Sequence, residues 1–169
     1  MKQILKVIIG IVILGVIGFG VYTILPEYPH NIVKSIVQPV TNARAKDLIH
    51  KVQNLPNKDV DNVMYKTILE KNTGMCSWVY DNEIEPGVEY VTFNGKGASI
   101  NLKEYAEYNG KMSTSCFVKV DFKIKGNSVE IVPYIDGVKM SIDDGKHEEM
   151  NKQIRADIFT QLYKGMKAD

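Results

Sequence analysis

The chain contains 169 residues, of which 21 are basic and 20 acidic, so its formal net charge is +1. A balance this even argues against a nucleic-acid-binding protein or a polybasic membrane clamp, because both need an excess of basic residues on one face. Removing Lys2 and Lys6 from the 21 basic residues leaves 19 against 20 acidic residues, so the rest of the chain is also nearly neutral.

The segment between Lys6 and Glu27 contains 20 residues without a charge. As a helix it covers roughly 30 Å, the thickness of the hydrocarbon core of a bilayer. A secretory signal peptide has a shorter apolar region, about 7 to 15 residues, followed closely by a small-residue cleavage site. The Ala43-Arg44-Ala45 sequence lies too far beyond Pro26 to serve as that site. We expect residues 1–26 to form a cytoplasmic stub and a retained transmembrane anchor in contact with membrane lipid.

The orientation of this anchor is predicted from charges and cysteines. Lys2 and Lys6 precede the apolar segment, but basic residues also follow it, so the positive-inside rule is nearly balanced. Cys76 and Cys116 form an even pair in a small domain, which favours a disulfide in an oxidising compartment over two buried thiols in the cytosol. That bridge would stabilise the domain by roughly 4 kcal/mol. We expect a single-pass protein of a bacterial inner membrane, with a cytoplasmic N-terminus and a periplasmic C-terminal domain.

Helical spacing recurs in the region that follows the anchor. Residues 27–41 are predicted to be a juxtamembrane linker with a short amphipathic helix, ended by Pro39, that lies on the membrane or packs under the domain. The domain itself is expected at residues 42–169. Its first two helices are predicted from Thr41 or Asn42 to Gln53 and from Asp59 to Lys71.

From Met75 onward the pattern has a period of two, which predicts strands. The sequences "MCSWVY" and "VEYVTF" predict a first pair, and "NGKG" at residues 94–97 predicts a turn. A short helix, or a continued strand, is expected near residues 102–108. The run that starts at Cys116 alternates apolar and charged residues, and Gly126-Asn127 and Asp136-Gly137 predict hairpin turns.

The C-terminal region carries apolar residues at steps of four, namely Met150, Ile154, Ile158, Leu162 and Met166. This spacing predicts one amphipathic helix across the apolar face of the sheet. The expected fold class is therefore α+β: a single N-terminal transmembrane helix, then a small domain with an antiparallel sheet of four to five strands and a C-terminal amphipathic helix.

Few residues are arranged for chemistry. The sequence "DDGKHEE" at residues 143–149 lacks the calcium-loop spacing and the further ligands that zinc needs, so we interpret it as the start of the last helix. A Cys-His nucleophile would need one of the cysteines as a thiolate beside a histidine. We expect no enzyme, no cofactor and no metal.

Aromatic residues supply the remaining candidates for a site. Trp78 and Tyr80 share one face of a strand, and Tyr105 and Tyr108 come from a neighbouring element. Exposed members of such a set would form a partner-binding surface, whereas buried members would fill the core.

The overall plan resembles that of type IV pilins and pseudopilins, which have one N-terminal hydrophobic helix followed by a small sheet domain with a disulfide. Those families carry a Glu five residues into the apolar segment, after a Gly cleavage site. Here hydrophobic residues precede Gly18-Phe19, and Thr23 stands where the Glu belongs. The resemblance therefore implies an architecture and not a function.

The function expected from these features is that of a membrane-anchored, non-enzymatic accessory or assembly subunit of a bacterial envelope complex. Such complexes include secretion systems, pilus machines and membrane-enzyme assemblies, and the expected partners are integral membrane or envelope proteins. The alternative is a tethered domain that binds a lipid or a cell-wall fragment, with methionines such as Met64 and Met140 lining an adaptable apolar cavity.

Overall fold

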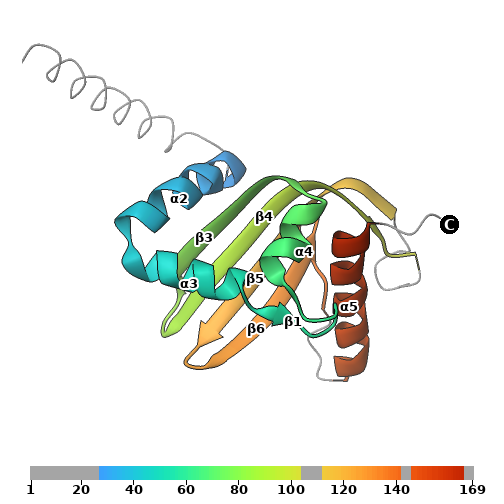
Figure 1. Cartoon of the computed structure of the whole chain (residues 1–169). Coiled ribbons are helices and arrows are strands. Elements are labelled where there is room, and N and C mark those ends of the chain that lie inside the picture. Colours follow the sequence, from blue (N-terminus) through green and yellow to red (C-terminus); the bar gives the residue numbers. More distant parts are fainter. Residues whose placement is uncertain (1–26, 104–111, 142–145, 166–169) are drawn as a thin grey trace, which may run out of the picture.

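The computed structural model describes residues 27–103, 112–141 and 146–165. Within these residues a five-stranded antiparallel sheet with strand order β3-β4-β5-β6-β7 packs with helices (Figure 1). The predicted α+β class, with an antiparallel sheet and a C-terminal helix, is confirmed for this part of the chain. The predicted anchor at residues 1–26 lies outside it. None of the helices described in the structure is both long enough and apolar enough to span a bilayer.

The strands of the main sheet are long at its centre and short at one edge. Their bounds are β3 (Gly74–Glu85), β4 (Val88–Asn101), β5 (Met112–Lys125), β6 (Ser128–Ile135) and β7 (Val138–Lys139). A separate pair consists of β1 (Pro56–Asn57) and β2 (Val63–Met64). The helices are α2 (Glu27–Thr41), α3 (Ala43–Gln53), α4 (Tyr65–Lys71) and α5 (Glu148–Lys164).

The alternation expected for β5 is confirmed and defines the core face of the sheet. Val120 and Phe122 are fully buried, whereas Lys119 and Lys123 on either side of this pair keep contact with solvent. Residues directly opposite each other in antiparallel strands point to the same face. The registers therefore extend this apolar row across the sheet, through Val91 and Phe93 of β4 to Trp78 and Tyr80 of β3.

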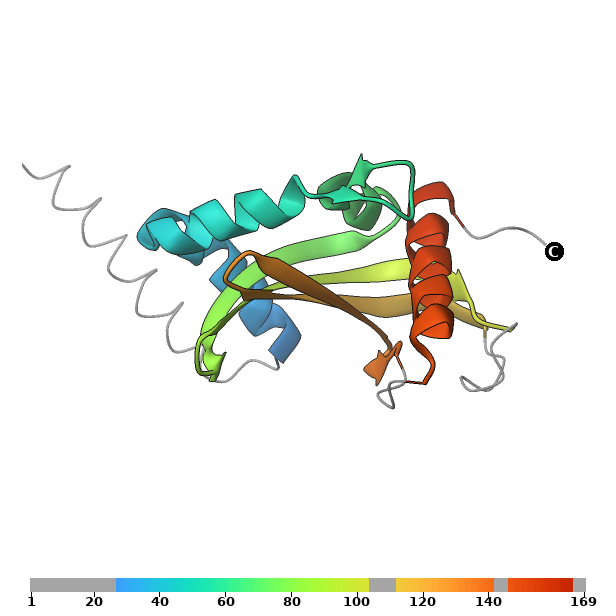
Figure 2. The ribbon, with the colours of Figure 1, turned by 90° about the horizontal axis from the view of Figure 1, so that it is seen from below.

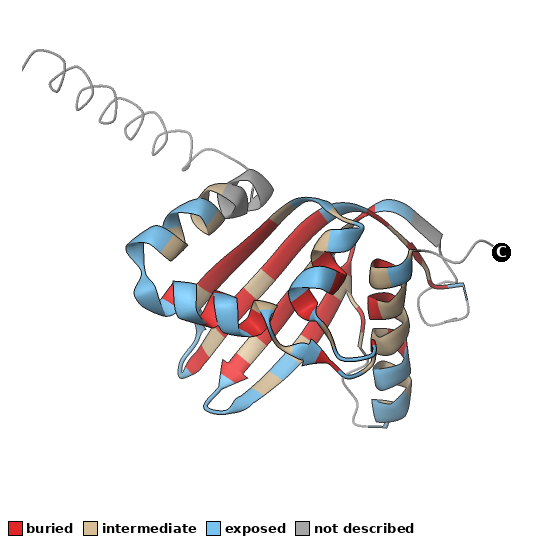
Figure 3. Cartoon of the chain, viewed as in Figure 1, coloured by how far each residue is buried: buried red, intermediate tan, exposed pale blue. Residues whose placement is uncertain are grey.

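Helices cover this apolar face. α3 and α4 lie over it, and α5 packs against α4 and β4 at one end (Figures 1 and 2). Tyr65 of α4 joins these parts, because its ring packs edge-on against Phe122 at 5.1 Å and against Phe159 of α5 at 5.2 Å. Figure 3 shows that many of the buried residues lie along the strands beneath the helices.

Three local predictions were wrong. α4 begins at Tyr65 and not at Asp59, because Asp61 and Asn62 adopt positive φ values of 49° and 57°, which break a helix. The "NGKG" sequence is not a turn. β4 runs through it with a register shift near Gly97, whose φ is +100°. Pro39 lies within α2 and does not end it.

Two glutamine side chains close exposed edges of the sheet. β3 is an edge strand, and the amide of Gln38 in α2 pairs with both backbone groups of Tyr80: Nε2 donates to the carbonyl at 2.7 Å and Oε1 accepts from the N–H at 2.9 Å. Gln161 of α5 pairs in the same way with Asn101, at 2.7 and 3.0 Å, where β4 extends past its pairing with β3. Each amide takes the place of a missing strand.

Candidate binding cleft

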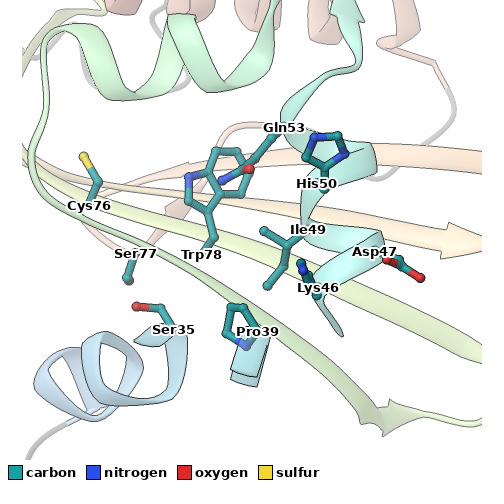
Figure 4. Close-up of a pocket in the computed structure, with 10 residues that line it drawn as sticks. All are labelled: Ser35, Pro39, Lys46, Asp47, Ile49, His50, Gln53, Cys76, Ser77 and Trp78. Atoms are coloured by element: carbon teal, nitrogen blue, oxygen red, sulfur yellow. The ribbon is translucent and has the colours of Figure 1, made fainter. Parts of the chain in front are cut away.

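A cleft of about 520 Å³ opens between α2, α3 and the outer edge of β3 (Figure 4). α2 contributes Ser35 and Pro39, and α3 contributes side chains along one face, which are Lys46, Asp47, Ile49, His50 and Gln53. The floor is formed by three consecutive residues of β3, which are Cys76, Ser77 and Trp78. The cleft thus lies at the β3 edge of the sheet, between two helices.

The α2 wall is fastened to β3 by polar contacts. Besides the Gln38 amide, Lys34 forms an ion pair with Asp81 at 3.0 Å. Burial raises the pKa of the Asp81 carboxyl, but the Glu83 N–H and the Lys34 ammonium lower it by more, so the pKa lies below its usual value. Of the two placements predicted for this helix, on the membrane or packed under the domain, its apolar residues Ile36 and Val37 do not adopt the second, since both are exposed.

The α3 wall is fastened by apolar packing, as predicted. Asn42 caps the helix by accepting from the Ala45 N–H at 3.1 Å. The apolar stripe is buried against the sheet, and its members are Ala45, Leu48, Ile49 and Val52. At the rim, Arg44 forms a two-pronged pair with Glu89, which also accepts from the Tyr80 hydroxyl at 2.9 Å. The hydrogen bond from Arg44 lowers the pKa of Glu89.

The edge of β3 presents backbone groups to the cleft. The Tyr80 N–H and C=O bind Gln38, so they point away from β4. Residues of an antiparallel strand alternate between pairing with the neighbouring strand and pointing outward. The register is continuous from Ser77 to Asp81, so the N–H and C=O of Trp78 point to the same outer edge as those of Tyr80.

The cleft also contains a buried hydroxyl group without a partner. Ser77 is 2% exposed, and its Oγ has no hydrogen-bond partner. The residue opposite it on β4, Asn94, is equally buried and its Nδ2 also lacks a partner. Leaving a buried polar group unpaired costs about 1–3 kcal/mol. Such groups are uncommon in folded proteins, and they indicate a place where a ligand or a water molecule can bind.

Cys76 is a thiol within this cleft. Its Sγ lies 3.0 Å from the Thr73 hydroxyl, and burial raises the pKa of the thiol. Because a raised pKa disfavours the thiolate, Cys76 is a poor nucleophile. His50 also lines the cleft but lies on the other side of Trp78 in Figure 4. The two side chains do not form a nucleophile and base pair.

The predicted Cys76–Cys116 disulfide is not formed. The sulfur of Cys116 instead donates to the Ala98 carbonyl at 3.1 Å, on the strand opposite. Cys76 lies on β3 and Cys116 on β5, with β4 between them. Strands two places apart are separated by roughly 9.5 Å, whereas a disulfide needs Cα atoms within about 7 Å. The sheet order therefore keeps the two cysteines apart.

The other predicted site residues have different positions. Trp78 and Tyr80 share a face, but it is the core face, and each is 6% exposed, so this pair does not form an exposed aromatic surface. The indole of Trp78 packs on Phe93 at 5.0 Å and donates to Glu70 at 2.9 Å. Tyr105 and Tyr108 lie outside the described residues, as do Asp143 and Asp144 of the "DDGKHEE" sequence. In the part of the chain that is described, no cluster of three metal-ligating side chains occurs.

The chain matches no protein-family model, no curated protein and no solved structure. The cleft and the surface around it are therefore the basis for any statement about function. Sequence reasoning missed Ser77, which lines this cleft, and Gln38, which binds the neighbouring Tyr80 and holds α2 against β3. The available signal was the placement of Lys34 and Gln38 on one helical face just before an edge strand, because a polar face can bind a strand edge.

Proposed function

We propose that this protein is a membrane-anchored, non-enzymatic accessory or assembly subunit of a bacterial envelope complex, acting through protein contacts of its C-terminal domain. Residues 7–26 cross the inner membrane once and hold the domain in the periplasm. Because the two cysteines lie on separated strands, the support for this orientation is reduced to Lys2 and Lys6 before the apolar segment, which the basic residues after it nearly balance.

The observation that carries the proposal is the apolar surface of α2. Ile36 is 67% exposed, Val37 48% and Val40 85%, and they sit on the side of α2 away from β3. α2 starts at Glu27, directly after the apolar segment. An amphipathic helix in this position places its apolar face in the membrane interface. The domain is thereby held close against the bilayer, where membrane partners are within reach.

The first experiment tests the position of α2. A photoreactive benzophenone amino acid at position 40 of the full-length protein in nanodiscs is expected to crosslink to lipid. The matched control places it at position 66, an exposed site on α4. Equal lipid crosslinking from both positions, or none from position 40, would contradict the proposed position of α2.

The second experiment tests the assembly role. The tagged full-length protein is extracted with a mild detergent and its partners are identified by mass spectrometry. Recovery in fixed stoichiometry with integral membrane or envelope proteins is expected. If the protein is recovered alone, while crosslinking from position 40 still reports lipid, then the anchor is correct and the assembly role is wrong.

The cleft favours a second candidate, a tethered binding domain for a lipid or a cell-wall fragment. Its lining is mixed, with Lys46, Asp47 and Gln53 beside Ile49 and Trp78. A lipid site is expected to be more enclosed and apolar. The methionines named for such a cavity do not support one, since Met140 is buried in the core and Met64 is 48% exposed. A polar cell-wall fragment fits this lining better than an acyl chain does.

A further inference from the structure

We propose that the cleft binds an extended peptide segment of a partner protein, which adds as a strand to the outer edge of β3 between α2 and α3. This proposal rests on the assembly role proposed above and identifies the surface through which the contact is made. The occupant is a polypeptide and not a small molecule, for three reasons.

The first reason is the backbone of β3. The N–H and C=O of Trp78 face the cleft from an edge strand, as inferred from the register and from the pairing of Tyr80 with Gln38. A donor and an acceptor from one residue of an edge strand match the backbone of an added strand. Natural proteins usually cover or blunt such an edge. Here Gln38 covers the edge of β3 at Tyr80, whereas the edge at Trp78, two residues earlier, is left open.

The second reason is that the molecule already makes this interaction at the neighbouring position. The Gln38 side chain carries a primary amide, which has the same donor and acceptor groups as a peptide bond. It binds Tyr80 through both of them, at 2.7 and 2.9 Å. A peptide that binds Trp78 would extend the same row of hydrogen bonds along the edge by one repeat of the strand.

The third reason is the pair of walls. Ile49 and Pro39 give apolar surface on either side, and the unpartnered Ser77 hydroxyl lies on the α2 side of the strand, facing Ser35 (Figure 4). Lys46 and Asp47 both stand on the α3 wall, so that wall has no dominant sign of charge. Affinity is therefore expected from backbone hydrogen bonds and side-chain fit, and less from charge attraction.

The test uses the full-length protein in nanodiscs and a display library of short linear peptides. Enriched peptides are synthesised, and their affinities are compared for the wild type, His50→Trp and Lys51→Trp. His50 lines the cleft and Lys51 does not, although both are exposed and adjacent on α3. We expect a loss of affinity of at least about tenfold for His50→Trp and no change for Lys51→Trp. Unchanged melting temperatures show that both variants fold.

A second measurement examines the mode of binding. Each backbone nitrogen of an enriched peptide is methylated in turn, which removes one hydrogen-bond donor at a time. Strand addition predicts that affinity falls at alternate positions, because only every second N–H of an added strand faces β3. The proposal is overturned if no peptide is enriched, if His50→Trp binds as well as Lys51→Trp, or if the losses show no alternation.

The peptide site and the assembly role can fail independently, and the experiments distinguish the two failures. If membrane partners still co-purify with His50→Trp in the usual stoichiometry, the assembly role stands and the cleft is not its contact surface. If peptides bind the cleft with the expected alternation while the protein extracted from membranes has no stoichiometric partner, then the cleft is a peptide site and the assembly role is wrong.

Discussion

α5 and α2 are helices of similar length, with 17 and 15 residues, and both were predicted to be amphipathic, yet they use their apolar residues differently. α5 buries all of the central ones, which are Ile154, Ile158, Phe159 and Leu162, each 1% exposed or less. α2 contacts the sheet through Lys34 and Gln38 and leaves Ile36 and Val40 in solvent. An apolar stripe identifies the face of a helix that is expected to be buried, but no part of the described fold buries the apolar face of α2.

The largest expected effect on stability is at a buried residue of α5. Phe159→Ala removes a ring that packs on Tyr65 at 5.2 Å and is fully buried. We expect the free energy of unfolding to fall by about 3–5 kcal/mol, because a cavity remains. Trp78 is the single tryptophan and is buried, so its fluorescence reports unfolding in denaturant.

The matched change on α2 is Val40→Ala, at a residue that is 85% exposed. In detergent it is expected to change the free energy of unfolding by no more than about 0.5 kcal/mol. A loss comparable to that of Phe159→Ala would mean that α2 is covered by protein, which would contradict its proposed position in the membrane interface.

An effect smaller than that of Phe159→Ala, but larger than that of Val40→Ala, is expected where each helix closes a strand edge. Gln161→Ala and Gln38→Ala each remove an amide that binds two backbone groups. The expected loss is about 1–2 kcal/mol for either change, since the freed groups regain water only in part. Amide hydrogen exchange separates the two variants: protection is expected to fall at Asn101 in the first and at Tyr80 in the second. A uniform fall across the sheet would show that neither glutamine acts locally.

The smallest expected effect is a pH dependence that concerns α2. The folded-state pKa of Asp81 lies below its unfolded value, so its carboxylate contributes stability above about pH 4. That contribution is lost as the pH falls through the folded-state pKa. Lys34→Ala removes one cause of the shift. The difference in melting temperature between wild type and this variant is therefore expected to be largest near neutral pH and to shrink in acid.

The pattern of residues predicted individual helices and strands well, but it did not predict which strands are neighbours in the sheet. The alternation in β5 and the steps of four in α5 are local, and both predicted a helix or strand and its buried face correctly. The order of strands is not local. Placing β4 between β3 and β5 separated Cys76 from Cys116 and removed the disulfide on which the predicted compartment partly rested.

The cleft depends on the same non-local information. Trp78 was singled out because of its side chain, which is in the core, whereas its role in the cleft comes from its backbone and from its place on an edge strand. Nothing in the residue pattern near Ser77 marks its hydroxyl as unpaired, since that follows from the packing of α2 against β3.

Asn42 is the single residue between α2 and α3, and its extended backbone, with φ −132° and ψ 103°, sets the angle between them. Its N–H donates to the Gln38 carbonyl at 2.8 Å and its carbonyl accepts from the Lys46 N–H at 3.1 Å, so it holds the two walls of the cleft at this angle. α2 is roughly 22 Å long at 1.5 Å per residue, so a change of about 5° in this angle would displace its far end by about 2 Å. Lys34 and Gln38 resist that change at two points along α2. The width of the cleft at the far end of α2 therefore depends on these two contacts and not on the apolar core.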